Sequence, residues 1–404
     1  MSKQIVIVGG GAAGFFSAIH HKKANPKASV IIIEKSSKVL QKVKISGGGR
    51  CNLTHSCFEP KALVQNYPRG HKELLGPFYT FQAKHTVAWF NKHGVAVKTE
   101  ADGRIFPQSN TSQTIIDCLR DTTDQLGISV WTNCIIQSIN KTNSQFMLSL
   151  KNGNTLQCDT LVLATGSSPW GFQAAKQFGH TVHDPIPSLF TFKINDPNLH
   201  SLSGLSIKNA EVKLSGKKSK IITAPLLITH WGLSGPAIIK LSAWEAKRLF
   251  EQNYNDTLLL NFLPAYSSYD ILQMLHTFAK KNPQKHLVSV SPFLELPQRI
   301  WAYLINRLQF SEQSTWISLQ KKAFNRLLSA LTQSQFLISG KGQFKEEFVT
   351  CGGVSLKEIN FKNMESKVCP GLHIIGELLN IDGVTGGFNF QNAWTTAYLS
   401  AQLK

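Results

Sequence analysis

The sequence predicts an α/β protein in which one parallel-sheet domain is interrupted by a β-rich part and a helical part. Three observations predict this class. An apolar strand enters a glycine-rich turn and a helix within the first 25 residues, β-rich segments begin after residue 185, and helical patterns run from about residue 267 to 337. Short strands and a terminal helix return in the last 60 residues, so we interpret the middle as an insertion between two halves of one domain.

The first elements form a βαβ unit. A strand over residues 5–8, a helix over 12–23 and a strand over 29–34 have the length of a parallel crossover. Further along, the patterns predict a helix and an extended stretch in 85–100, a helix and a strand in 112–141, and a buried strand over 160–164.

The later segments set the expected domain boundaries. We expect the first domain to comprise residues 1–188 and 346–404, the β-rich insert 189–265 and the helical domain 266–345. Apolar residues recur at three- and four-residue spacing in the helical part, which is the period of an amphipathic helix.

Composition narrows the class of protein. The 404 residues are 42% hydrophobic, which is enough for more than one core. No apolar run reaches the roughly 18–20 residues that span a bilayer, and the first apolar stretch runs into a turn rather than a cleavage site. The seven cysteines are scattered, without metal-binding spacing. We expect a reduced, cytoplasmic protein without a structural metal or disulfides.

The charge is unevenly distributed. The chain has 43 basic and 24 acidic residues, a formal charge of +19. Residues 1–100 carry a net +11 and residues 266–345 a net +7. Such a surface attracts polyanions, nucleic acid first and anionic membrane second. A role in solubility alone is the alternative interpretation.

The glycine turn at residues 9–14 follows a strand and opens a helix. Gly9 allows the tight turn, Gly11 lets the backbone approach a diphosphate, and Gly14 lets the helix pack on the sheet. Glu34 ends the second strand, 20 residues beyond Gly14, where a carboxylate accepts hydrogen bonds from ribose hydroxyls. This pattern predicts a bound dinucleotide, either NAD or FAD. The expected contacts are Gly9, Gly11, Ala12, Ala13, Gly14 and Glu34.

A second glycine-rich segment reads "LQKVKISGGGRCNLTH" over residues 40–55. Three consecutive glycines do not form a stable helix or strand interior. Flanked by Lys42, Lys44 and Arg50, they suit close approach to a phosphate or to an electron-poor ring. A mobile surface loop is the alternative.

A stretch near the end of the chain, residues 373–394, distinguishes NAD from FAD. "HIIGELLNIDGVTGGFNFQNAW" places Asp382 where a carboxylate can bond a ribose or ribityl hydroxyl, and Gly386 and Gly387 open the last helix. A helix N-terminus aimed at a flavin stabilises the negative charge of the reduced ring. These features favour FAD. Because a second Gly-x-Gly-x-x-Gly is missing, we expect the reductant to dock transiently or to be another protein.

These stretches resemble one family. "IVIVGGGAAG", "ISGGGRCNLTH", "LVLATGSSPWG", "THWGLSGPAIIKLS", "VTCGGVSLKEIN" and "GELLNIDGVTGGFNFQNAW" are similar to the bacterial flavoproteins called HI0933-like or aminoacetone-oxidase-like, within the two-dinucleotide-binding-fold superfamily. The resemblance spans the chain. It implies a Rossmann-like FAD-binding domain with an inserted β-barrel-like domain and a helical domain. Gly48, where many members have Asn, and Cys351, where a small inert residue is commoner, depart from the pattern.

The resemblance also implies further cofactor contacts. They are Lys35, Lys42, Ser46, Gly48, Gly49, Arg50, Ile135, Ala164, Thr165, Gly166, Gly376, Glu377, Asp382, Gly386, Gly387, Phe388 and Asn389. No metal is expected.

Family members are linked to small amines, to steroid-like enones and to reduction of uracil to dihydrouracil in large ribosomal RNA. The basic residues near the glycines and those of the helical part favour the ribosomal RNA substrate, with NADH or NADPH as the reductant. The helical set is Lys280, Lys281, Lys285, Arg299, Arg307, Lys321, Lys322 and Arg326. The alternatives are an FAD-dependent reductase or oxidase of a small enone or amine, and a flavin-binding scaffold without catalysis.

Uracil reduction requires a hydride from flavin N5 at C6 and an acid that protonates C5. Cys51 and Cys351 are candidate acids, because an unperturbed thiol is protonated at pH 7; each also fits a small packed residue. Arg50 is a candidate partner of the flavin or a phosphate, or else a surface ion pair. His230 is a candidate donor to a substrate carbonyl, or else a structural histidine.

Overall fold

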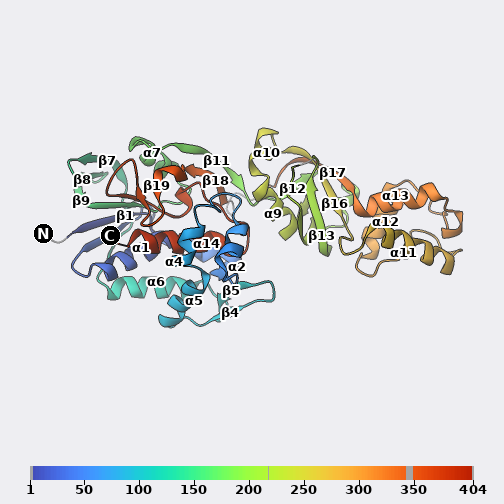
Figure 1. Ribbon diagram of the computed structural model, residues 1–404, viewed down its shortest axis with the longest axis horizontal. Coiled ribbons are helices and arrows are strands. Elements are labelled where there is room, and N and C mark those ends of the chain that lie inside the picture. Colours follow the sequence, from blue (N-terminus) through green and yellow to red (C-terminus); the bar gives the residue numbers. More distant parts are fainter. Residues whose placement is uncertain (1–2, 217, 343–348, 403–404) are drawn as a thin grey trace. The chain divides into compact units, whose positions relative to one another are not determined.

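The two ends of the chain fold together. In a computed structural model, Met1–Ile186 and Val349–Lys404 form one unit, and Pro187–Phe348 forms a second (Figure 1). The structure describes residues 3–216, 218–342 and 349–402. The expected boundary at residues 345 and 346 therefore lies outside the described residues, and the division of the insertion into two domains stays a prediction.

A seven-stranded sheet forms the centre of the first unit, in the order β19-β20-β21-β10-β1-β2-β6. The five strands from β21 to β6 are parallel, and β20 and β19 continue the sheet antiparallel. The bounds are β1 Gln4–Val8, β2 Ser29–Ile33, β6 Ser129–Trp131, β10 Thr160–Leu163, β19 Ile359–Asn360, β20 Glu365–Ser366 and β21 Leu372–Ile374. Apolar, largely β-branched residues fill β1, β2 and β10, as expected for strands buried on both faces. The predicted Rossmann-like class is confirmed.

Helices and smaller sheets surround this sheet. The helices are α1 Ala12–Ala24, α2 Gln41–Gly49, α3 Pro60–Leu63, α4 Leu75–Thr80, α5 Ala83–Lys92, α6 Gln113–Gln125, α7 Pro169–Gln177 and α14 Phe388–Ser400. The other strands are β3 Thr54–His55, β4 Val97–Thr99, β5 Arg104–Pro107, β7 Ile136–Thr142, β8 Gln145–Leu150, β9 Thr155–Cys158, β11 Val182–Ser188 and β18 Val349–Val354. They form a β3-β5-β4 sheet, a β7-β8-β9 sheet and a β11-β18 pair.

Helices α1 and α14 lie side by side and run in the same direction (Figure 1). Phe16 contacts Trp394 at 5.2 Å between ring centroids, and His20 contacts Tyr398 one turn later at 4.9 Å. This parallel packing brings the N-termini of both helices to the same end of the helix pair.

The second unit is built on a closed barrel in the order β12-β15-β14-β13-β16-β17. Its strands are β12 Phe192–Ile194, β13 Ser206–Leu214, β14 Ile222–Thr229, β15 Gly232–Ser234, β16 Asn255–Asn261 and β17 Ser334–Lys341. Its helices are α8 Pro197–His200, α9 Pro236–Trp244, α10 Ala246–Glu251, α11 Ser268–Lys281, α12 Gln298–Arg307 and α13 Lys321–Thr332. The expected barrel-like insert and helical part are both present.

The helical pattern predicted up to residue 337 is wrong at its end. Residues 334–341 form β17, which pairs with β12 and β16 and closes the barrel. Phe336 and Ile338 are buried while Leu337 is 73% exposed, which is the two-residue alternation of a strand. The alternation is short and directly follows the longer helical pattern of α13, so it was assigned to the helix.

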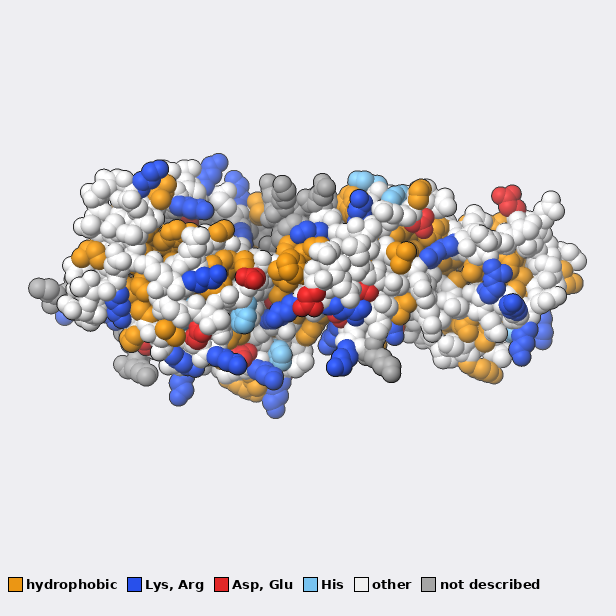
Figure 2. Space-filling view, turned by 90° about the horizontal axis from the view of Figure 1, so that it is seen from above, with side chains coloured by type: hydrophobic (Ala, Val, Ile, Leu, Met, Phe, Trp, Pro, Cys, Tyr) orange, Lys and Arg blue, Asp and Glu red, His pale blue; other side chains and the backbone are white. Residues whose placement is uncertain are grey.

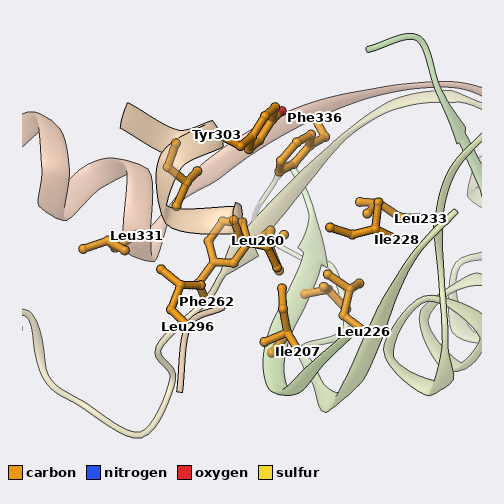
Figure 3. Close-up of a cluster of buried hydrophobic side chains, with 14 of the residues drawn as sticks. Ile207, Leu226, Ile228, Leu233, Leu260, Phe262, Leu296, Tyr303, Leu331 and Phe336 are labelled. Carbon is orange, nitrogen blue, oxygen red and sulfur yellow. The ribbon is translucent and has the colours of Figure 1, made fainter. Parts of the chain in front are cut away.

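The barrel interior and the neighbouring helices share one hydrophobic core. Figure 3 shows Leu260 and Phe262 of the barrel close to Leu296, Tyr303 and Leu331 of the helical part. Among the described residues, every helix of either unit is too short or too polar to cross a membrane.

Helix α1 carries a half-buried histidine, His20, and a buried one, His21, that make stability dependent on pH. Burial lowers the pKa of His20 and of His21 to about 3, with further lowering by Lys23 and His93 for His20 and by His373 for His21. In the unfolded chain each imidazole titrates near pH 6.5. Between these values the unfolded chain binds more protons than the folded protein, so the free energy of unfolding falls as the pH falls.

We expect each histidine to lower the free energy of unfolding by about 1.4 kcal/mol between pH 7.5 and 5.5. Urea unfolding at both pH values measures the loss in the native protein and in His21→Gln, in which one imidazole is absent. The variant will lose about 1.4 kcal/mol less than the native protein over this range. Equal losses in the two proteins would contradict the assignment.

Candidate active site

The glycine turn lies at the carboxyl end of β1, where the order of the strands in the sheet reverses direction. β1 has β2 on one side and β10 on the other, and ligands of open α/β sheets bind at such a crevice. A Cβ at Gly9 would lie 2.4 Å from the Ala164 carbonyl oxygen, and one at Gly14 would lie 1.9 Å from the Gly9 carbonyl oxygen. Both glycines are therefore required by the packing of the protein itself.

Gly11 differs from these two glycines. A Cβ built on Gly11 meets no atom within 4 Å, so packing within the protein does not require glycine there. Gly11 is the N-cap of α1, which has no acidic residue in its first turn and no side-chain cap. The first N–H groups of α1, at Ala12 and Ala13, thus have no intrahelical acceptor and form the positive end of the helix dipole. Open space above such N–H groups fits a diphosphate.

Glu34 lies at the end of β2 beside this turn. Its Oε2 accepts a hydrogen bond from the Gly10 N–H at 2.9 Å, and its Oε1 accepts from the Ser36 N–H and hydroxyl. An ionised carboxylate has about four acceptor sites, so Glu34 retains capacity for ribose hydroxyls.

A cavity opens from Glu34 along the ends of the strands. Five of the predicted cofactor contacts line it, namely Gly9, Glu34, Lys35, Ile135 and Thr165. Cys134, Ser168 and Trp170 line it as well and were not predicted from the sequence. The Thr165 hydroxyl is buried and has no hydrogen-bond partner among the described residues. Apolar walls with a few polar groups at one end fit the adenosine half of a dinucleotide.

Glu377 marks the opposite side of the crevice. Its Oε2 forms an ion pair with Lys42 Nζ at 2.5 Å and lies 3.7 Å from a Cβ built on Gly166, while its Oε1 accepts from the Thr350 N–H at 3.2 Å. Gly376 lies against Ala13, because a Cβ there would be 3.1 Å from the Ala13 Cβ. Residues from five separate stretches of the sequence are thus brought together at one edge of the sheet.

The second glycine-rich segment interrupts α2. Ser46, Gly47 and Gly48 have non-helical dihedral angles, and all three glycines have positive φ. Ser112 fixes the segment, because its N–H donates to the Gly49 carbonyl and its hydroxyl donates to the Lys44 carbonyl, each at 2.8 Å. Gly47 and Gly48 are exposed. The prediction that these glycines do not form a regular helix interior is confirmed.

Arg50 and Cys51 follow the three glycines of this segment. Arg50 Nη1 forms an ion pair with Glu100 at 2.6 Å, and its guanidinium lies 4.0 Å from the centroid of the Phe106 ring. Cys51 is fully buried with φ +60°, and burial raises the pKa of its thiol to about 12. The thiol is therefore protonated at neutral pH.

The N-terminus of α14 packs on the segment that follows Cys51. A Cβ at Gly387 would lie 2.7 Å from Thr54, and the Phe388 ring stacks on His55 at 4.8 Å. Asn389 holds the turn before the helix, since its side chain accepts from the Gly383 N–H and donates to the Gly383 carbonyl. α14 has neither a side-chain cap nor an acid in its first turn, so its positive end is uncompensated, like that of α1.

Arg69 is a site residue that the sequence analysis missed. Its Nε donates to Asp382 Oδ1 at 2.5 Å and its Nη2 contacts Asp382 Oδ2. The Asp382 side chain is fully buried and that of Arg69 is 12% exposed. "YPRG" contains no recognisable motif, and the two residues are 313 positions apart, so no local signal connects them.

The other candidate catalytic residues lie in different places. Cys351 is fully buried in β18 of the first unit. His230 belongs to the second unit, where it lies exposed on the turn between β14 and β15 and contacts the Trp231 ring edge-on. Their roles stay predictions.

Comparison with known proteins identifies relatives along nearly the whole chain. The family model described as HI0933-like protein Rossmann domain matches residues 3–403. The chain is 31% identical over 385 residues to the ribosomal RNA dihydrouridine synthase of Escherichia coli, covering 92% of this chain and 91% of that protein. It is 28% identical to the protein of the same name from Haemophilus influenzae, covering 92% of each.

Two further similar proteins carry names that describe other activities. A 3-dehydro-bile acid delta(4,6)-reductase of Clostridium scindens is 25% identical, with 93% of this chain and 92% of that protein covered. The solved structure of a 3-ketosteroid delta1-dehydrogenase from Sterolibacterium denitrificans superposes with a TM-score of 0.50 at 11% identity, covering 99% of each chain. That structure shows a shared fold.

Proposed function

Because the chain belongs to the HI0933-like family of FAD-dependent oxidoreductases, we propose that it reduces uracil to dihydrouracil in ribosomal RNA. The names of the Escherichia coli and Haemophilus influenzae relatives support this substrate. NADH or NADPH is the proposed reductant, docking transiently, since the sequence has no second Gly-x-Gly-x-x-Gly.

The observation that carries the RNA proposal is the charge of the chain. The formal charge is +19, of which +11 falls in residues 1–100, the part that contains both glycine-rich segments. Lys35, Lys38, Lys42 and Lys44 are all exposed around these segments. A small neutral substrate does not require such a field, whereas an RNA substrate is attracted by it.

The protein must hold the cofactor and protonate the base. FAD, when bound and reduced, supplies the hydride for the C5–C6 double bond of uracil. The open backbone at Gly11 and the carboxylate of Glu34 would hold its diphosphate and ribose, and the positive end of α14 would favour negative charge near the ring.

An acid must then deliver a proton to C5. Cys51 is held protonated by burial and lies three residues after the exposed Gly48. Cys351 is the third residue of β18. We propose one of these thiols as the proton donor. General acid catalysis contributes about 10²- to 10⁴-fold, so replacing the true donor by alanine should slow uracil reduction by that factor while FAD remains bound.

A second candidate function is reduction of a small enone. The Clostridium scindens relative, named a bile acid reductase, supports it. In this case the basic surface would serve solubility, and the reaction would not depend on ionic strength.

Anaerobic single-turnover reduction distinguishes the two candidates. The purified flavoprotein is reduced with dithionite and mixed either with a transcript of large-subunit ribosomal RNA or with a steroid enone. The proposal predicts flavin reoxidation and dihydrouridine formation with the transcript only, at a rate that falls as salt is added. Reoxidation by the enone alone would establish the second candidate. If neither compound reoxidises the flavin, both are rejected in favour of a non-catalytic flavin-binding scaffold.

A further inference from the structure

The helical part of the second unit gathers lysines at one end. Lys280 and Lys281 are the last two residues of α11, Lys285 follows, and Lys321 and Lys322 are the first two residues of α13. All five side chains are exposed. We call these five residues the lysine cluster. Figure 2 shows Lys and Arg side chains on the surface of the helical part.

Backbone contacts and ring stacking hold the two helix ends together. The His276 ring of α11 stacks on Phe324 of α13 at 4.1 Å, one turn from each group of lysines. The short helix Trp316–Ser318 joins them, since the Trp316 N–H donates to the Lys285 carbonyl and the Ile317 N–H donates to the Pro283 carbonyl. The five lysines, which come from three places in the sequence, therefore share one surface.

The charges of α13 are opposed by its own helix dipole. α11 follows the usual rule, with Ser267 and Asp270 forming a capping box at its N-terminus and lysines in its last turn. α13 begins with two lysines, has no acid in its first turn and has no side-chain cap. Cations at the positive end of a helix destabilise it. Lys321 and Lys322 thus lie where folding alone disfavours them.

The protein supplies little compensating negative charge. Among the described residues, none of the five lysines forms an ion pair with a carboxylate. Of the three acids in residues 266–342, Asp270 caps α11 and Glu295 accepts from the Tyr266 hydroxyl at 2.5 Å, which leaves Glu312. By contrast, Arg299, Arg307 and Arg326 each donate to a backbone carbonyl and serve the fold.

We infer that the lysine cluster is a contact surface for the phosphates of folded RNA. The compensating anion must come from outside the chain, and closely spaced cations on a rigid helix pair suit the phosphates of an RNA backbone. Ile317, 65% exposed, belongs to the short helix that bonds to the Pro283–Lys285 stretch and can add an apolar contact. This inference rests on the proposed RNA substrate and assigns part of its recognition to the second unit.

Titration of binding against salt tests the inference. The full-length flavoprotein, Lys321→Gln/Lys322→Gln and the control Lys208→Gln/Lys247→Gln are compared on a folded transcript of large-subunit ribosomal RNA. The control removes two exposed lysines of the same unit that lie outside the cluster. The slope of log K against log salt should become shallower by about 1.5 in the first variant, at about 0.7 to 0.9 per phosphate contact, and much less in the control.

Thermal unfolding gives a second readout. The midpoint of Lys321→Gln/Lys322→Gln should stay equal or rise, because two cations leave the positive end of α13. A lower midpoint would make the lysines structural and overturn the inference. Equal slopes of log K against log salt for the native protein and the variant would overturn it too. An equal decrease of this slope in the variant and in the control would also overturn it.

Two further outcomes separate this inference from the proposed function. A variant that binds RNA like the native protein, while the native protein forms dihydrouridine, refutes the lysine cluster alone. Lysine-dependent RNA binding by a native protein that forms no dihydrouridine refutes the proposed function and supports the lysine cluster. If the variant instead loses binding to phosphatidylglycerol vesicles and keeps RNA binding, the surface contacts a membrane and the inference fails.

Discussion

Gly11→Ala will fold like the native protein and lose most of its FAD affinity. The added Cβ meets no protein atom within 4 Å, so the fold has room for it, and the N-cap backbone at φ −93° suits any residue. The same methyl group would occupy the space in which we place the cofactor diphosphate. Overpacking by one methyl group costs about 1–3 kcal/mol, which corresponds to a Kd raised about 5- to 150-fold.

Fluorescence titration of the apoprotein with FAD measures this loss, and urea unfolding of the apoprotein measures the fold. Gly14→Ala is the matched control, because its Cβ would lie 1.9 Å from the Gly9 carbonyl oxygen and the apoprotein itself should be destabilised. If Gly11→Ala binds FAD with native affinity, the diphosphate does not lie above Gly11. A destabilised Gly11→Ala apoprotein would also contradict the open space above the turn.

Arg69→Met will destabilise the protein by about 3–5 kcal/mol, since it leaves a buried charge without its partner. The Asp382 side chain is fully buried and both of its oxygens contact the Arg69 guanidinium. Removing the Arg69 guanidinium leaves the buried Asp382 carboxylate without that cation and without access to water. Urea unfolding of the apoprotein at neutral pH measures the loss.

Arg69→Met/Asp382→Asn separates the buried charge from the lost packing. This double variant removes both charges and should recover at least half of the stability lost in Arg69→Met, because an uncharged amide is less costly to bury than an unpaired carboxylate. If the free energy of unfolding of Arg69→Met lies within about 1 kcal/mol of the native value, the pair behaves like an exposed ion pair and not like a buried one. A double variant no more stable than the single one would show the same.

Local patterns predicted the parts of the site that are local in the sequence. Strand β1, the glycine turn and helix α1 were predicted within one or two residues, since period, glycine positions and helix start all lie within 25 residues. The start of α14 after Gly387 was also predicted, because two glycines precede an uninterrupted helical pattern.

The remaining features depend on contacts between distant segments. The pairing of Arg69 with Asp382, and of Lys42 with Glu377, joins residues more than 300 positions apart. The closing strand β17 depends on its neighbours β12 and β16, since its own alternation is short. The anchoring of Arg50 by Glu100 and Phe106 likewise requires the β4-β5 hairpin to fold beside it. None of these partners is visible in a sequence window.

The most direct test of the account is mass spectrometry of nucleosides from large-subunit ribosomal RNA. RNA is compared from the source organism, from a deletion strain, and from that strain carrying the native gene or Gly11→Ala. We predict that dihydrouridine is lost on deletion, restored by the native gene and restored poorly by the variant, whose FAD affinity is reduced. Unchanged dihydrouridine in the deletion strain would contradict the account.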